Sequence, residues 1–187
     1  MKLYGHSIGT CAVRNDNAFL LIPKNASTSY TSLGHIDNIQ NTTINWKTFV
    51  VTLRDPFTRW LAGVSEYYIR HEFEYSRIED LERVLDKVEL DEHTVPQIRF
   101  FEQLVDNQSA DFYLLENGLE KVNDTYKLWS DIPVSYKSTS LKKAIQYGLK
   151  WYVKANPELG RKIKSFYKED YDFISKQFPK YNFKEVV

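Results

Sequence analysis

The stretch Phe19-Leu-Leu-Ile-Pro-Lys-Asn-Ala-Ser-Thr-Ser-Tyr30 joins an apolar run to a cluster of small polar residues, with Lys24 at the junction. The run Ala18–Ile22 predicts a buried strand, and Ser27 or Thr28 is placed to cap a helix that follows it. A helix N-terminus offers unpaired N–H groups and a partial positive charge, which favour a phosphate or sulfate group. The stretch therefore predicts either an anion-binding loop, to which Lys24 adds a full charge, or an ordinary capped helix.

A second strand, loop and helix follow further along the chain. Thr48–Leu53 is a buried apolar run, Arg54 follows it, and Asp55 and Pro56 are typical of the cap and first residue of a helix. That helix should reach about residue 72, because its large apolar side chains recur at helical spacing. A basic residue thus stands at the carboxyl end of each strand, and ligands of open α/β sheets gather at that edge.

The remaining chain predicts further elements around this pair. We expect a hairpin over residues 11–22, irregular chain over 35–47, a third strand over 110–115 and a polar loop over 132–140. Helices are expected at 27–34, 77–90, 98–105 and 119–124, and in the C-terminal third, where Pro157 opens one segment and Tyr167–Phe178 forms the last. We therefore predict an α/β fold in a single domain, residues 1–187. Its P-loop-like central parallel sheet is flanked by helices, and its C-terminal third is helical.

Composition narrows the class of protein. The 187 residues include 25 basic and 25 acidic side chains, which argues against a broadly basic nucleic-acid binder. The single cysteine, Cys11, excludes an internal disulfide and an all-cysteine metal site, and it fits a reducing compartment. We find no GxxxxGK[ST] or GxGxxG motif, no metal-ligand spacing, no signal-peptide core and no apolar stretch near the ~20 residues of a membrane span. We expect a soluble, cytoplasmic protein that uses no metal and binds no nucleic acid.

The two strand–loop–helix units resemble motifs of the sulfotransferases, which use 3′-phosphoadenosine 5′-phosphosulfate (PAPS). Ile22–Ser29 resembles their 5′-phosphosulfate loop, and Leu53–Arg59 resembles their 3′-phosphate motif. Further segments resemble the carbohydrate sulfotransferase branch in the family's order: a histidine–x–x–proline–glutamine segment (91–97), a strand ending in glutamate (111–117), a lysine–serine loop (133–138) and a terminal helix (166–171). The resemblance covers most of the chain and implies a soluble, minimal microbial or viral form without the membrane anchors and disulfides of animal Golgi members.

The resemblance implies a role for each residue of the two loops. Lys24 matches the catalytic lysine beside the oxygen that bridges sulfur and phosphorus, where it would stabilise the leaving 5′-phosphate. Arg54 would clamp the 3′-phosphate with two parallel hydrogen bonds, or it would pair with a nearby carboxylate. Lys137 and Ser138 either close over the cofactor or form a plain loop. The other expected donors to the 5′-phosphate are Asn25, Ala26, Ser27, Thr28 and Ser29.

Two positions of the second motif leave alternatives open. Where the family has a serine that binds the 3′-phosphate, this chain has Ala62. Ser65 lies one helical turn later and shares a face with that position, so it is the candidate replacement. Arg59 either joins the phosphate site or faces outward from its helix.

The acceptor hydroxyl requires a general base. The resemblance places a histidine or glutamate soon after the first helix, which points to His35. The alternative role of His35 is to support the dipole of that helix. His93 is the second candidate base, or else it holds the following Pro96-Gln97 loop in place. The remaining candidates are Glu66, Glu92 and His71.

Three functions compete at this point. The first is transfer of a sulfuryl group from PAPS, with PAP as product, to a hydroxyl acceptor; a carbohydrate is expected, and a lipid-linked sugar or small alcohol is the alternative. The second is a P-loop nucleotide kinase or phosphotransferase, although the Walker glycines and a magnesium-binding pair are missing from the sequence. The third is a non-catalytic relative that binds PAP, PAPS or a glycan, which the alanine at position 62 keeps open. The sequence predicts no oligomeric state.

Overall fold

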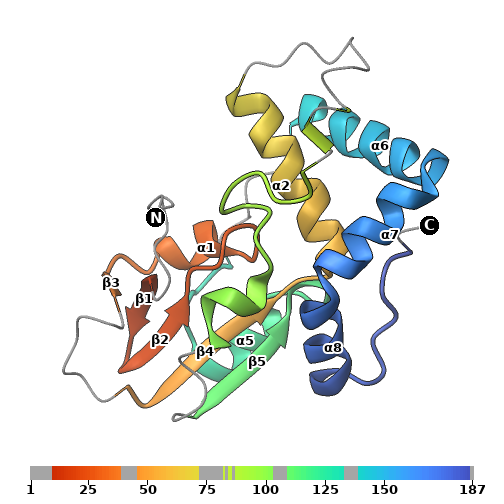
Figure 1. Ribbon diagram of the computed structural model, residues 1–187. Coiled ribbons are helices and arrows are strands. Elements are labelled where there is room, and N and C mark those ends of the chain that lie inside the picture. The colour runs from red at the N-terminus through yellow and green to blue at the C-terminus, as the bar shows by residue number, and fades with distance from the viewer. Residues whose placement is uncertain are drawn as a thin grey trace. The chain divides into compact units, whose positions relative to one another are not determined.

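The computed structural model describes residues 10–38, 46–71, 82, 84–85, 87–102, 109–132 and 139–185 (Figure 1). The chain divides into two compact units. The first, here called the sheet unit, comprises Met1–Arg54 and Gln97–Lys137; the second, the helical unit, comprises Asp55–Pro96 and Ser138–Val187. The prediction that both belong to one domain stays a prediction.

The sheet unit contains a five-stranded sheet in the order β3-β1-β2-β4-β5. Its strands are β1 (Thr10–Arg14), β2 (Asn17–Leu20), β3 (Ile36–Asn38), β4 (Thr48–Leu53) and β5 (Ala110–Leu114). The strands β2, β4 and β5 run parallel, whereas β1 is antiparallel to both of its neighbours. The α/β class is therefore confirmed, but the sheet is mixed and not wholly parallel. The P-loop-like arrangement stays a prediction.

The predicted hairpin is present and begins the sheet. Asn15 and Asp16 have φ values of 48° and 61°, and two central residues with positive φ define the type I′ turn that suits the twist of paired strands. The side chain of Asn17 donates to the carbonyl of Asn15 at 2.9 Å and supports the turn. The strand assignment ends at Leu20, two residues earlier than predicted, although the N–H of Leu21 still donates to Thr10.

One strand lies where irregular chain was expected. The three residues of β3 pair with β1 in antiparallel register, and the carbonyl of His35 accepts a hydrogen bond from Val13. These three residues carry no alternating apolar pattern. The open edge of β1 specifies this strand, so the local sequence could not reveal it.

The two faces of the sheet are buried by different side chains, because successive residues of a strand point to opposite faces. One face packs with the short helices α1 (Ser27–Thr31) and α5 (Glu120–Tyr126). Its buried residues are Ala12, Phe19, Leu21, Tyr30, Val50, Leu119, Val122 and Leu128. The other face buries Cys11, Ala18, Trp46 and Phe49. The unit also contains two short 3-10 turns, η2 (Gln97–Phe100) and η3 (Leu115–Asn117). Residues 103–105 of the predicted 98–105 helix lie outside the described residues.

The helical unit is built from α2 (Pro56–Arg70), α6 (Ser140–Ala155), α7 (Pro157–Phe166) and α8 (Lys168–Gln177). Its core comprises Phe57, Trp60, Val64, Tyr68, Val84, Leu85, Leu149, Val153, Ile163 and Tyr167. Proline is the first residue of both α2 and α7, as predicted. Half of the predicted 77–90 helix lies outside the described residues. Of the other half, residues 82, 84 and 85 are helical, whereas the prediction is wrong for 87–90, which are not. Among the described parts of the chain, none of the helices combines the length and the apolar character that a membrane crossing requires.

Asp55 begins the helical unit and uses both oxygens of its carboxylate. Oδ1 accepts from the N–H of Thr58 at 2.9 Å, which is the predicted N-cap of α2. Oδ2 accepts from the N–H of Lys184 at 2.8 Å and from the hydroxyl of Tyr181 at 3.2 Å. One buried side chain thus fixes the start of a helix and the C-terminal segment of the chain.

Candidate functional site

The loop after β2 has an unusual backbone. Lys24 and Ala26 both have positive φ, 67° and 64°, a left-handed conformation that costs a non-glycine residue about 1–2 kcal/mol. The N–H of Asn25 donates back to the carbonyl of Ile22, so the chain turns sharply between the two. Ala26 occupies the N-cap of α1 and its carbonyl accepts from Ser29. The prediction that Ser27 or Thr28 caps this helix is wrong, because the left-handed Ala26 starts the helix at Ser27 without a side-chain cap.

A buried amide network holds this loop against the end of β4. The side-chain N–H of Asn25 donates to the carbonyl of Thr52 at 3.0 Å and to Oε1 of Gln97 at 2.6 Å. Gln97 also accepts from the N–H of Arg54 at 3.0 Å and donates to the carbonyl of Arg54 at 2.7 Å. Asn25 and Gln97 are almost fully buried. The network therefore compensates for the unfavourable backbone of the loop and links the two predicted cofactor motifs.

Arg54 joins the same loop through its side chain. Its Nη1 donates to the carbonyl of Lys24 at 3.0 Å, and its Nε lies 3.9 Å from Oε1 of Glu116. The side chain of Arg54 is 23% exposed, so the guanidinium keeps a path to solvent. The structure is thus compatible with both predicted alternatives for Arg54, because the side chain lies beside the loop of Lys24 and also approaches a carboxylate.

The hydroxyls after Ala26 differ in their surroundings. Thr28 is exposed and Ser27 is half-buried, whereas Ser29 is buried. Within the described part of the chain, Oγ of Ser29 and Oδ1 of Asn25 have no hydrogen-bond partner. A buried polar atom without a partner costs about 1–3 kcal/mol, so these two atoms mark the loop as a place suited to a polar ligand or water.

Arg59 is fully buried in the helical unit. Its Nη1 donates to the carbonyl of Val95 and its Nη2 to the carbonyl of Glu92 at 3.3 Å. Burial lowers the pKa of this guanidinium, against the charges of Tyr167, Asp170 and Asp91. The alternative of an outward-facing helix residue is wrong, because Arg59 instead fixes the loop that contains His93.

Ser65, the candidate for the 3′-phosphate, is also fully buried. Its hydroxyl donates to the carbonyl of Ala62 at 2.9 Å and accepts from the side-chain amide of Gln146 at 3.2 Å. These bonds occupy its proton within the helical unit. Lys137 and Ser138, the other predicted cofactor residues in this part of the sequence, lie outside the described residues.

His93 lies in a tightly bonded turn. Its Nδ1 is 3.0 Å from Oδ2 of Asp91, and its backbone N–H donates to Oδ1 of the same carboxylate at 2.9 Å. Burial alone would raise the pKa of Asp91, but the hydrogen bonds and charge of His93 and the charge of Arg70 outweigh burial and lower it. The side chain of His93 is only 6% exposed. Asp91 therefore orients the imidazole ring, leaving Nε2 as the ring atom available for chemistry.

The same turn contains the one group of described residues with metal-ligand character. Asp91, Glu92 and His93 offer ligand atoms that lie within 4.8 Å of one another. Nδ1 of His93 and Oδ2 of Asp91 already satisfy each other, and Glu92 lies 3.8 Å from Nη1 of Arg70. The contacts of the turn thus account for these side chains without an ion.

The remaining candidate bases have different contacts. The side chain of His35 is 69% exposed, and its Nε2 lies 4.0 Å from Oδ2 of Asp37. Glu66 pairs with Lys142 and with Arg70. The ring of His71 lies 4.3 Å from the ring of Tyr67. Among the described contacts of these candidates, the ring of His93 has a carboxylate oxygen at hydrogen-bond distance, Oδ2 of Asp91 at 3.0 Å.

Two residues at the carboxyl edge of the sheet were not predicted as site residues. Gln97 bonds to both loops, and Glu116 follows β5 and approaches Arg54. The resemblance offered a signal for each, because Gln97 ends the histidine–x–x–proline–glutamine segment and Glu116 ends the third predicted strand. Neither residue type shows its role through spacing alone.

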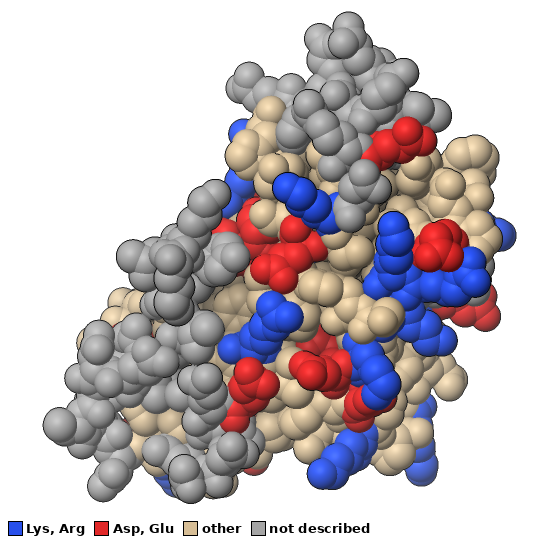
Figure 2. Space-filling view, viewed as in Figure 1, with Lys and Arg blue, Asp and Glu red and all other residues tan. Residues whose placement is uncertain are grey.

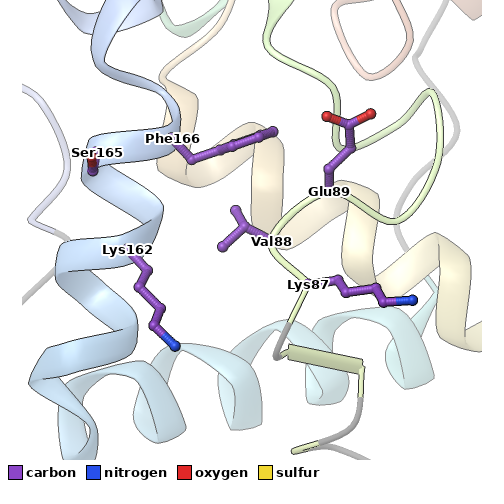
Figure 3. Close-up of a pocket in the computed structure, with 6 residues that line it drawn as sticks. All are labelled: Lys87, Val88, Glu89, Lys162, Ser165 and Phe166. Carbon is purple, nitrogen blue, oxygen red and sulfur yellow. The ribbon is translucent and has the colours of Figure 1, made fainter.

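The helical unit contains a hollow of about 570 Å³, lined by Lys87, Val88, Glu89, Lys162, Ser165 and Phe166 (Figure 3). In Figure 3 the side chains of Lys87 and Lys162 extend in different directions, and the carboxylate of Glu89 points away from both. The polar groups do not converge on one point. This hollow therefore lacks the arrangement that a specific ligand site requires.

Comparisons with protein-family models, with curated proteins and with solved structures found no match. Function is therefore inferred from the chemistry of these residues and from the motifs that they form.

Proposed function

We propose that the chain is a PAPS-dependent sulfotransferase that transfers a sulfuryl group to a hydroxyl, with a carbohydrate as the expected acceptor. One observation carries the proposal: the guanidinium of Arg54 donates to the carbonyl of Lys24, so the two motif loops meet at the ends of neighbouring parallel strands. Ligands of α/β sheets bind at that edge. In this proposal β2, β4 and β5 form the P-loop-like core.

Sulfuryl transfer requires stabilisation of charge on the moving group and on the leaving phosphate. The acceptor oxygen forms a bond to sulfur, the bond from sulfur to the 5′-phosphate oxygen breaks, and the acceptor proton passes to a base. Lys24 would neutralise the charge that develops on the leaving phosphate. The hydroxyl of Ser29, which has no partner among the described residues, fits a phosphate oxygen, because it lies buried in α1 directly after the loop and can donate. Arg54 would bind the 3′-phosphate.

We propose His93 as the general base, ahead of His35. Asp91 accepts a hydrogen bond from Nδ1, which leaves the lone pair on Nε2. His35 is exposed and lies 4.0 Å from the nearest carboxylate, so its ring has no comparable support. His93→Ala should abolish turnover and retain PAP binding, whereas His35→Ala should retain turnover. The opposite pair of results would return the role to His35.

Calorimetry with PAP tests the cofactor site. We expect wild type to bind PAP without a metal ion. Lys24→Ala and Arg54→Ala should each weaken binding about 10–100-fold, because a hydrogen bond to a charged group contributes about 1.5–3 kcal/mol. Lys121→Ala and Arg14→Ala are matched controls, since both side chains are exposed on the same unit and belong to neither loop. No binding of PAP by wild type would overturn the proposal.

Two further arms separate the competing functions. Thermal stabilisation by ATP with magnesium, but not by PAP, would indicate a phosphotransferase. PAP binding without transfer of labelled sulfate to any acceptor of a broad panel would indicate a non-catalytic relative. Figure 2 shows basic and acidic side chains interspersed on the face in view, so neutral and weakly charged glycans belong in the panel beside polyanionic ones.

A further inference from the structure

Helix α6 exposes large apolar side chains on the face turned away from its own core. Leu149 and Val153 are buried in the core of the helical unit. On the opposite side Tyr147 is 76% exposed and Trp151 is 66% exposed, and Leu141 at the start of the helix is 52% exposed. An ordinary surface helix carries polar residues there. The exposed aromatic pair therefore requires an explanation.

These side chains form one continuous apolar ridge. Tyr147 and Trp151 are four residues apart, so they lie one above the other on the helix. Gly148 lies beside them, and a Cβ atom added to it would meet nothing within 4 Å. Ala144 and Ala155 extend the ridge and are also exposed. We call this face, with Leu141, the α6 ridge.

Lysines follow the ridge and no acidic residue interrupts it. Ser140–Ala155 contains Lys142, Lys143, Lys150 and Lys154 and neither Asp nor Glu. Lys142 is paired with Glu66. The other three are exposed, and at 100° per residue they fall on one flank, next to Tyr147. The helix thus presents an apolar, aromatic ridge bordered by a row of positive charge, in a chain whose net charge is zero.

We propose that the α6 ridge docks on the surface of an anionic lipid bilayer. Trp and Tyr concentrate at membrane interfaces, and amphipathic helices with flanking lysines bind anionic lipids by combined apolar burial and charge attraction. The row of lysines is complementary to acidic headgroups. The same row disfavours a dimer formed through this ridge, because a two-fold contact would bring two rows of positively charged lysines together. A sugar chain is less suited, since a convex helix face offers no walls to enclose it. The inference does not depend on the proposed function.

Co-sedimentation with vesicles tests the proposal. We expect the protein to bind phosphatidylcholine vesicles that contain about 30% phosphatidylserine, to bind pure phosphatidylcholine weakly, and to dissociate as salt rises. Replacing Lys143, Lys150 and Lys154 together by Gln should lower the partition coefficient about 100-fold. Tyr147→Ser with Trp151→Ser should lower it about tenfold. Because all five side chains are exposed, the variants should keep the melting temperature of wild type.

Lys121→Gln with Lys164→Gln and Lys176→Gln provides a charge-matched control on the exposed faces of other helices, and it should bind vesicles nearly as wild type does. Equal binding of wild type to neutral and anionic vesicles would overturn the proposal, as would unchanged binding by the Tyr147 and Trp151 variant. Sedimentation equilibrium gives the remaining outcome. A wild-type dimer that the Trp151 substitution dissociates would show that a second copy covers the ridge, and this too would overturn the proposal.

Discussion

Arg54 and Arg59 belong to one short stretch of sequence but have different surroundings. Arg54 directly follows β4, whereas Arg59 lies in the first turn of α2. The side chain of Arg54 is 23% exposed, donates to the carbonyl of Lys24 and approaches the carboxylate of Glu116. Arg59 is fully buried, and its guanidinium donates to the backbone carbonyls of Val95 and Glu92. One motif can therefore contain both a partly exposed residue at the edge of the sheet where ligands bind and a buried residue that holds a neighbouring turn in place. Resemblance to the motif does not tell the two apart.

The largest effect is expected from removing the hydrogen bonds of Arg59 to the His93 turn. Arg59→Met should lower the free energy of unfolding by about 2–6 kcal/mol, because two carbonyls of the His93 turn lose their donor at about 1–3 kcal/mol each. Arg54→Met should cost about 1 kcal/mol, since its carbonyl partner is nearer solvent. Urea denaturation followed by circular dichroism measures both. Equal losses would show that Arg54 is as structural as Arg59.

A glycine pair tests whether the turn braced by Arg59 is packed tightly. A Cβ atom on Gly63 would meet the carbonyl group of His93 and lie 2.9 Å from Cγ2 of Thr94, so Gly63→Ala should destabilise by about 1–3 kcal/mol. Gly148→Ala is the control in open space on α6, where alanine should stabilise by about 0.5–1 kcal/mol. Thermal melts of the two variants should shift in opposite directions. A neutral Gly63→Ala would mean that the turn can move aside.

Gln97 provides a test of the surroundings of Arg54, because its side-chain amide bonds to both the N–H and the carbonyl of Arg54. Gln97→Ala should lower stability by about 1–2 kcal/mol and weaken PAP binding, since the loop of Lys24 and Asn25 loses its support. Gln177→Ala, at the exposed end of α8, should change neither quantity. Lost stability with unchanged PAP affinity would separate the network from the proposed ligand site.

The smallest effect concerns pH. The folded state lowers the pKa of Asp91 below its ordinary 3.8, so its ionised form stabilises the fold above that value. The contribution disappears as pH falls through the lowered pKa, because the folded carboxylate must then bind a proton. Asp91→Asn should therefore flatten the loss of stability between pH 5 and about pH 3 relative to wild type. Urea midpoints across that range measure it, and parallel curves would contradict the role of the pair.

Much of the fold could be predicted because its signals are local. The apolar runs of β4 and β5, the Asp55-Pro56 start of α2 and the proline that opens α7 each specify structure within a few residues. The three-residue β3 gave no such signal, because its partner strand determines it. The left-handed Ala26 was also hidden. Alanine rarely adopts that conformation, and here buried bonds from distant residues maintain it.

The residues of the candidate site likewise differ in whether a local sequence signal could predict them. Lys24 and Arg54 follow apolar strands and could be predicted from the sequence as a pair at one edge of the sheet. Gln97 could not, because it acts on Arg54 across 43 positions of sequence. The burial of Arg59 could not be predicted either, since the carbonyls that accept its hydrogen bonds belong to a turn more than 30 residues away. Spacing along the chain reports local geometry, whereas these roles depend on which distant backbone groups need partners.

The two oxygens of the Asp55 carboxylate imply an order of events during synthesis. Oδ1 needs only the N–H of Thr58, three residues later, so the start of α2 can be capped as soon as that short segment leaves the ribosome. Oδ2 accepts from Lys184, 129 residues away, and the entropic cost of closing a loop rises with its length. Until residues 181 to 184 have been made, Oδ2 lacks both of these donors. A nascent chain thus gains its helix start early and the fastening of its C-terminal segment last.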